Sequence, residues 1–210
     1  NGGRIATRIN LQIACPTELA YNDFTVANGG VGMAMNNAAE PTLLTLSGFD
    51  VSASSDGLQI GDRVSVDVVD SRFTGITSTF IGNASIAIGN AADVRVRGSV
   101  FEDSNFAIVT GGAFGSLDVR GSTFRRLSRA VTVRAATATS TIEAHGNVFE
   151  NVVTVASYDT GSRDLFEFQG NFIGGFTDAG TAGRAVKGVA AGTVPIAIAQ
   201  VTDHVDNPTN

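Results

Sequence analysis

The chain of 210 residues contains one cysteine, two tyrosines and no tryptophan, and each shortage excludes something. Cys15 alone cannot form an internal disulfide, so packing and hydrogen bonds must hold the fold together. Sugars dock on exposed Trp and Tyr, and a chain with only Tyr21 and Tyr158 lacks such a platform, which argues against carbohydrate processing. Charged residues are also scarce, at 16% against roughly 25% in an average soluble domain.

The balance of charge is acidic, with a net charge of -6 and an isoelectric point near 4.8. Phosphate binding needs a basic face, so no nucleic-acid partner is expected. The longest uncharged stretch near the end, residues 188–202, is broken by Gly and Pro and is too short for a membrane span, which needs about 20 apolar residues. Because the chain starts at Asn1 rather than Met, we expect a removed leader or a fragment.

Familiar catalytic and metal motifs are missing from the sequence. There is no GxSxG motif, and the two histidines, His145 and His204, lie outside HExxH or calcium-loop contexts. "GGVG" (29–32) reads as a turn, because no helix pattern follows it. We therefore expect no cofactor, with calcium as the one exception if the chain were a lyase.

What the chain does contain is a repeat anchored on phenylalanine, with intervals of 23 to 28 residues. Its seven anchors are Phe24, Phe49, Phe73, Phe101, Phe124, Phe149 and Phe172. Before each anchor stands a small polar residue: Asn22, Ser47, Ser71, Ser99, Ser122, Asn147 and Asn171. Alternating apolar pairs such as Val94 and Val96 precede the anchor, and second pairs such as Ile86 and Ile88 or Val153 and Val155 follow it. Each copy therefore predicts two short strands, each with one buried face.

A unit of about 24 residues cannot bury its own apolar face, so the copies must stack as a solenoid. The recurring "VxVxGSxF" pattern over residues 20–175 resembles the right-handed parallel β-helix, pectate-lyase-like superfamily. We expect an all-β, right-handed parallel β-helix of about seven coils, with an internal Phe stack and a Ser/Asn stack beside it. Gly98, Gly121, Gly146 and Gly170, with Asp70 earlier, are expected to make the turn with positive φ.

The predicted organisation is a capping segment (1–19), the β-helix (20–180) and a C-terminal capping strand and tail (181–210). The longest repeat interval predicts an insertion within residues 74–85, and insertions in solenoids map to loops on one face. Parallel coils leave unpaired edge groups at their ends, so we expect self-association or a larger surface assembly.

The strand before each Phe places charged residues in two outward columns. The first column contains Asp67, Arg95, Asp118, Glu143 and Glu167, and the second contains Val69, Arg97, Arg120, His145 and Gln169. In pectate-lyase-like enzymes, carboxylates on such a face hold calcium and an Arg or Lys abstracts the proton beside a uronate. The resemblance thus makes Arg97, Arg120, His145, Asp118 and Glu143 the candidate catalytic residues, with Arg120 or His145 as base. Arg95 interrupts the column of carboxylates, and cross-strand ion pairing on a wet sheet face is the alternative.

Three functions remain open on this evidence. The expected one is a non-catalytic extracellular module, structural or adhesive, of a cell-surface, filament or phage-fibre assembly. A polysaccharide lyase or hydrolase acting on an acidic glycan through the Arg/His/carboxylate row is the first alternative. A glycan-binding module without chemistry is the second.

Overall fold

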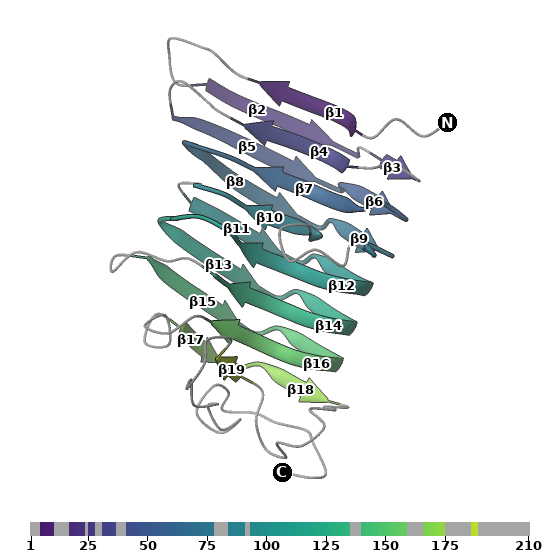
Figure 1. Ribbon diagram of the computed structural model, residues 1–210, viewed down its shortest axis with the longest axis vertical. Helices are drawn as coiled ribbons and strands as arrows, with labels where there is room; N and C mark the ends of the chain where they lie inside the picture. The colour runs from purple at the N-terminus through teal and green to yellow at the C-terminus, as the bar shows by residue number, and fades with distance from the viewer. Residues whose placement is uncertain are drawn as a thin grey trace.

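In the computed structural model of the protein, the residues described are 5–10, 17–23, 25–27, 31–36, 41–77, 84–90, 93–134, 140–158, 166–174 and 186–188. All regular structure in these residues is β-strand, and the strands stack into one elongated solenoid (Figure 1). No helix in the described part of the chain has the length and hydrophobicity that a membrane crossing needs.

Two parallel sheets form the walls of the solenoid. The seven strands of sheet B are β2 (Thr17–Asn22), β5 (Thr42–Ser47), β8 (Val64–Val69), β11 (Asp93–Arg97), β13 (Ser116–Arg120), β15 (Thr141–His145) and β17 (Phe166–Gln169). The twelve strands of sheet A are β1 (Ile5–Asn10), β3 (Thr25–Ala27), β4 (Val31–Asn36), β6 (Asp50–Ser52), β7 (Asp56–Ile60), β9 (Arg72–Thr74), β10 (Ile86–Ile88), β12 (Val100–Thr110), β14 (Thr123–Val133), β16 (Val148–Tyr158), β18 (Phe172–Gly174) and β19 (Val186–Gly188).

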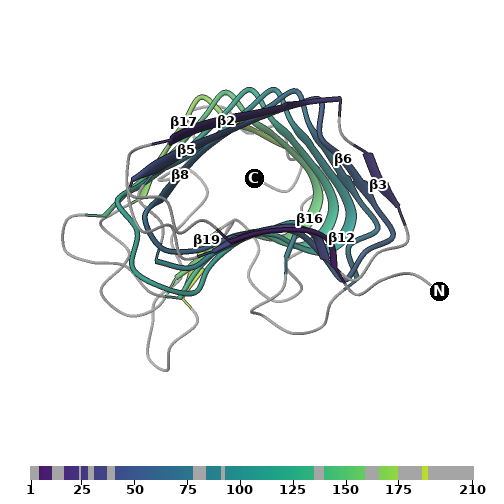
Figure 2. The same ribbon diagram turned by 90° about the horizontal axis from the view of Figure 1, so that it is seen from above.

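Sheet A bends around a corner of the solenoid. Seen from above, sheet B runs along the top of the ring, while sheet A covers the right side and the bottom (Figure 2). In the early coils two short strands make this path, and β12, β14 and β16 later span it as single strands of 11 residues. Each long strand turns at a residue with positive φ: Asp103, Arg126 or Asn151.

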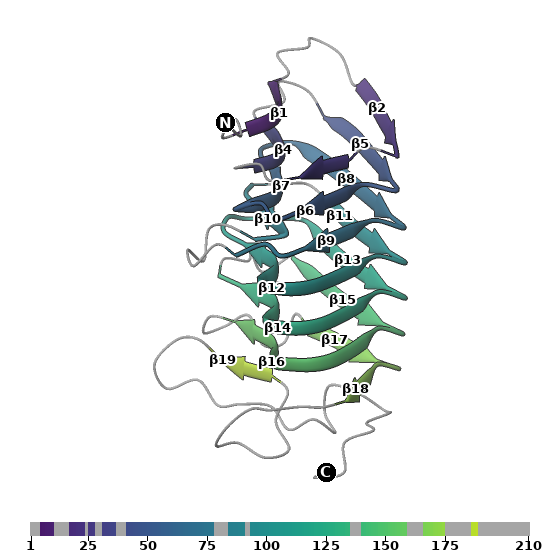
Figure 3. The ribbon, with the colours of Figure 1, turned by 90° about the vertical axis from the view of Figure 1, so that its right-hand side faces the viewer.

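Every strand pair is parallel and lies one coil from its neighbour, as Figure 3 shows from the side. The all-β parallel solenoid predicted from the repeat is therefore confirmed. About five turns are present, where the repeat predicted about seven coils. Seven strands pair in sheet B, and the first and last coils are described only in part. Strand β1, within the predicted N-terminal cap, pairs with β4 as a regular rung of sheet A.

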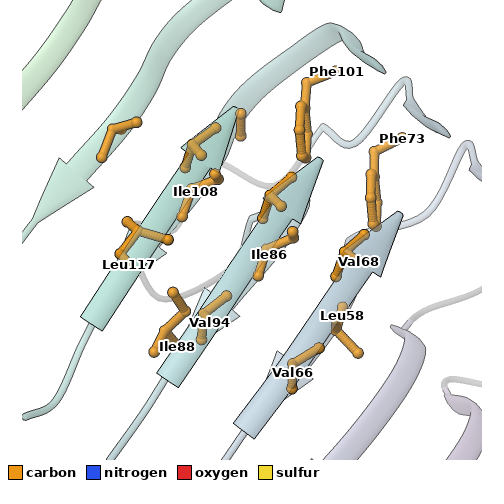
Figure 4. Packing of buried hydrophobic residues seen from close by; sticks show 14 of the residues in the cluster. Leu58, Val66, Val68, Phe73, Ile86, Ile88, Val94, Phe101, Ile108 and Leu117 are labelled. Atoms are coloured by element: carbon orange, nitrogen blue, oxygen red, sulfur yellow. The ribbon is translucent and has the colours of Figure 1, made fainter. Parts of the chain in front are cut away.

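The core is filled by the inward residues of both sheets, stacked like on like (Figure 4). Pairs such as Val94 and Val96 from sheet B face pairs such as Ile86 and Ile88 from sheet A, and all four are buried. The prediction that Val153 points inward is wrong. Val153 is 45% exposed, and its neighbour Val152 is buried instead, in register with Leu127. The cause is the positive φ of Asn151 in β16, which interrupts the regular alternation of the strand.

An aromatic stack runs through this core at the corner between the sheets. Phe73, Phe101, Phe124 and Phe149 lie in register, with ring centroids 4.8 to 5.0 Å apart and nearly parallel planes. Phe49 is also buried but meets Phe73 edge-on, at 5.8 Å and 78°.

The predicted stack of seven phenylalanines is thus too long. Val51, not Phe49, is in register with Phe73, and Ile173, not Phe172, is in register with Phe149. Phe172 is only half-buried, opposite Val148, and Phe24 lies outside the described residues. The turn residue explains both shifts, because Phe49 stands two residues closer to its turn glycine, and Phe172 one residue closer, than the other rings do.

Beside the rings, a buried polar ladder satisfies backbone groups at the turn. The backbone N–H of Ser71 donates to Ser99 Oγ at 3.2 Å, and the N–H of Ser99 donates to Ser122 Oγ at 3.2 Å. Asn147 and Asn171 continue this pattern with Oδ1 as the acceptor. Asn22 and Ser47 were expected in the ladder but belong to β2 and β5, in register with Val69 of sheet B, so this part of the prediction is wrong.

The turn residues adopt the predicted backbone conformation. Gly98, Gly121, Gly146 and Gly170 have φ between 58° and 62°, and Asp70 has φ 47°. A Cβ at Gly98 would lie 2.4 Å from Asp70 Oδ1 and would have to displace that carboxylate, and the positive φ strains any residue other than glycine.

We expect Phe124→Ala to lower the free energy of unfolding by about 3–5 kcal/mol, because it leaves a cavity between two stacked rings. Urea unfolding followed by circular dichroism measures this loss. Val153→Ala, at an exposed position, is the control and should change stability by less than about 0.5 kcal/mol. A loss below about 1 kcal/mol for Phe124→Ala would contradict the stacked core.

Candidate functional site

The outward face of sheet B brings the sequence-predicted charged residues together as two columns. Arg95 is in register with Asp67 and Asp118, and Asp118 with Glu143. Two residues along, Arg120 is in register with Arg97 and His145. We call these residues the sheet B row; Glu167 and Gln169 extend it by register into β17.

Ion pairs between and within coils tie the sheet B row together. Arg120 donates from Nε to Asp118 Oδ1 at 2.6 Å and from Nη2 to Glu143 Oε2 at 2.9 Å. Arg95 Nη1 lies 3.5 Å from Asp67 Oδ1, and His145 Nε2 lies 3.9 Å from Glu143 Oε2. Arg97 is exposed and makes no ion pair within the described part of the chain. The row therefore includes one guanidinium shared by two carboxylates on adjacent coils.

The electrostatics of Arg120 bear directly on its predicted role as base. The hydrogen bond that Arg120 donates to Asp118, together with the charges of Asp118 and Glu143, raises the pKa of this guanidinium above its ordinary value. A general base must be deprotonated near the working pH so that it can accept a proton. The two carboxylates do the opposite, because they stabilise the protonated form of the Arg120 guanidinium. In the described ranges, no three His, Cys, Asp or Glu side chains lie close enough to hold a metal ion.

A second charged group, missed by the sequence analysis, lies on sheet A next to the corner. The carboxylate of Glu102 on β12 is only 2% exposed and contacts Arg72, Arg125 and Arg126. We call this group, with Asp103, the corner cluster. Glu102 Oε2 accepts from Arg125 Nε at 2.6 Å and Arg126 Nη2 at 3.1 Å, and Oε1 accepts from Arg72.

Two opposing effects act on the pKa of Glu102. Burial raises it, but the hydrogen bonds and charges of Arg125 and Arg72 outweigh burial and hold the pKa below its ordinary value. The signal for this cluster was present in the repeat, since Glu102 and Arg125 each directly follow a stacked Phe. Comparing that position from copy to copy would have placed both residues in one column.

A pocket of about 180 Å³ opens on sheet A between β7, β10 and β12. Its lining includes Gln59, Ala87, Val109 and Gly111 and carries no acid, base or nucleophile. The pocket therefore offers a small apolar surface and no catalytic group.

Asp56, the first residue of β7, is a buried carboxylate of another kind. It is 2% exposed, its Oδ1 has no hydrogen-bond partner in the described ranges, and its Oδ2 accepts long hydrogen bonds of 3.4 Å from Ser55 and Gln59. Burial raises the pKa of Asp56 to about 6, and hydrogen bonds from Ser55, the backbone of Ala84 and Gln59 offset only part of the effect.

No match to the chain was found among protein-family models, curated proteins or solved structures.

Asp56 gives a prediction for the dependence of stability on pH. Its pKa is about 6 in the folded chain against an ordinary 3.8, so the folded state binds the proton more tightly. Its contribution to stability is fully present below about pH 4 and is lost as the pH rises through 6, by roughly 3 kcal/mol.

Asp56→Asn should remove this loss, so the variant should be more stable than the wild type at pH 7.5 while the difference shrinks at pH 4. Urea unfolding at a series of pH values measures it. Asp62→Asn, an exposed position between β7 and β8, controls for the loss of one negative charge. Equal stability of Asp56→Asn and wild type at pH 7.5 would contradict the unsatisfied carboxylate.

Proposed function

We propose that this chain is a non-catalytic structural or adhesive module of a cell-surface, filament or phage-fibre assembly, located outside the cell. We also propose that it belongs to the right-handed, pectate-lyase-like β-helices, on the combined support of its parallel coils, Phe stack and Ser/Asn ladder. Fold alone carries no activity, so the charged face of sheet B is the feature that distinguishes a structural module from an enzyme.

The observation that carries this proposal is the state of Arg120. The candidate base shares its guanidinium between Asp118 and Glu143, and its pKa is raised rather than lowered. The same two carboxylates, assigned to calcium or sugar under the lyase hypothesis, are already engaged by Arg120. Charge pairing between coils is the function that this geometry favours, because Arg120 offsets the repulsion between Asp118 and Glu143, which stack in register.

The assay that separates the proposal from a lyase uses acidic polysaccharides, such as polygalacturonate, with and without calcium. Unsaturated uronates absorb in the ultraviolet, and we expect no rise in absorbance. Turnover that disappears in both Arg120→Ala and His145→Ala would overturn the proposal and establish the lyase alternative. Binding without turnover that is lost in the same variants would favour the glycan-binding alternative.

Membership of an assembly predicts self-association. Parallel coils end in unpaired backbone groups, and covering them with another copy removes an exposed edge. Sedimentation velocity at several concentrations should give species larger than the monomer. A clean monomer at every concentration would remove the self-assembling version of the proposal.

A further inference from the structure

Each guanidinium group of the corner cluster has hydrogen-bond donors that are not used within the described part of the chain. Arg72 uses Nη2 on Glu102 and Nε on Thr74, and Arg125 uses Nε and Nη2 on Glu102. Arg126 uses Nε and Nη2 on Asp103 and Glu102. Within the described part of the chain, the Nη1 amino group of each of these three arginines makes no hydrogen bond.

The cluster is also positively charged in a protein whose net charge is -6. Three guanidinium groups contact the two carboxylates of Glu102 and Asp103, which leaves one positive charge. Asp50 and Glu150 border the cluster, in register with Arg72 and Arg125, but form no ion pair with them. The pKa of Glu102 and that of Asp103 are both lowered by the arginines, so this charge persists across neutral pH.

The arginines are accessible as well as positioned. Their side chains are 56%, 38% and 49% exposed for Arg72, Arg125 and Arg126, while the carboxylate that orients them is buried. They come from β9 and β14, which flank β12 on adjacent coils. A buried anchor thus fixes three half-exposed guanidinium groups around one point, and little conformational entropy is lost when a ligand binds.

We propose that the corner cluster is a binding site for an oxyanion, a carboxylate or sulfate group held by Arg72, Arg125 and Arg126. Guanidinium groups match the geometry of such oxyanions and form charge-assisted hydrogen bonds with them. The oxyanion comes either as a free ion or as a substituent of an acidic polymer. The site lies on sheet A, away from the sheet B row, and does not depend on the proposed function.

Calorimetric titration tests the site with two probes, inorganic sulfate and polygalacturonate, at constant ionic strength. We expect saturable binding in at least one arm. Binding should be at least about tenfold weaker in Arg126→Gln and in Arg72→Lys, which keeps the charge but loses the planar fork. Arg134→Gln, at an exposed arginine directly after β14 and outside both charged groups, is the matched control and should bind as the wild type does. Binding by sulfate identifies a site for free ions, and binding by polygalacturonate alone identifies a site for polymers.

Absence of saturable binding in both arms would overturn the proposal. So would an equal loss in Arg134→Gln, because it would mean that net charge alone drives binding, and so would unchanged binding in both cluster variants. Folding is checked by circular dichroism. Arg126→Gln leaves Arg72 and Arg125 on the buried Glu102, and if it fails to fold, Arg72→Lys with its retained charge carries the test alone.

Discussion

The register between successive coils is the constraint on which the rest of this structure depends. Parallel hydrogen bonding places each side chain about 4.8 Å from its counterpart in the next coil. Side chains at equivalent positions of successive coils must therefore be able to pack against each other. Apolar residues benefit, as the nearly parallel rings of Phe101 and Phe124 show. Charged residues do not. In the sheet B row Asp67, Arg95 and Asp118 alternate in sign, and where Asp118 and Glu143 stack, Arg120 bridges the two carboxylates. The corner cluster places Arg125 above Glu102 for the same reason.

Buried polar groups meet this constraint through the Ser/Asn ladder. Each serine accepts a backbone N–H from the preceding coil and donates its hydroxyl to a carbonyl two residues earlier in its own coil, as Ser99 does with Ser71 and Arg97. Asn147 can replace serine because its Oδ1 accepts in the same way and its Nδ2 donates to Val119 in the preceding coil. The backbone N–H groups at these turn positions therefore all have hydrogen-bond acceptors. This arrangement requires a small side chain with an acceptor oxygen at each position.

Much of the fold could be predicted because the constraint leaves a periodic trace in the sequence. The alternation of Val94 and Val96 and the recurrence of Gly121 and Gly146 identified strands, faces and turns. The errors came from taking Phe as the anchor. The turn residue with positive φ fixes the register of each coil. The buried position in register with Phe73 holds Val51 in the preceding coil, so phenylalanine is not required there.

The candidate sites could be predicted only in part. Register alone placed the sheet B row, since strand pairing aligns Asp118 with Glu143. The sharing of Arg120 between both carboxylates depends on side-chain torsions that no spacing encodes. The corner cluster is harder still to predict from register. Arg72 is in register with Val100, so its side chain must bend along the neighbouring strand to contact Glu102.

The central claim is the parallel, in-register stacking of coils, and paired cysteines test it directly in a Cys15→Ser background. Arg95→Cys with Asp118→Cys joins in-register positions on adjacent coils, within the Cα separation that a disulfide requires. Arg95→Cys with Arg120→Cys is displaced by two residues and exceeds roughly 7 Å. Mild oxidation followed by mass spectrometry of the folded protein should find the first pair cross-linked and the second reduced. A disulfide in the second pair but not the first would contradict the register and everything derived from it.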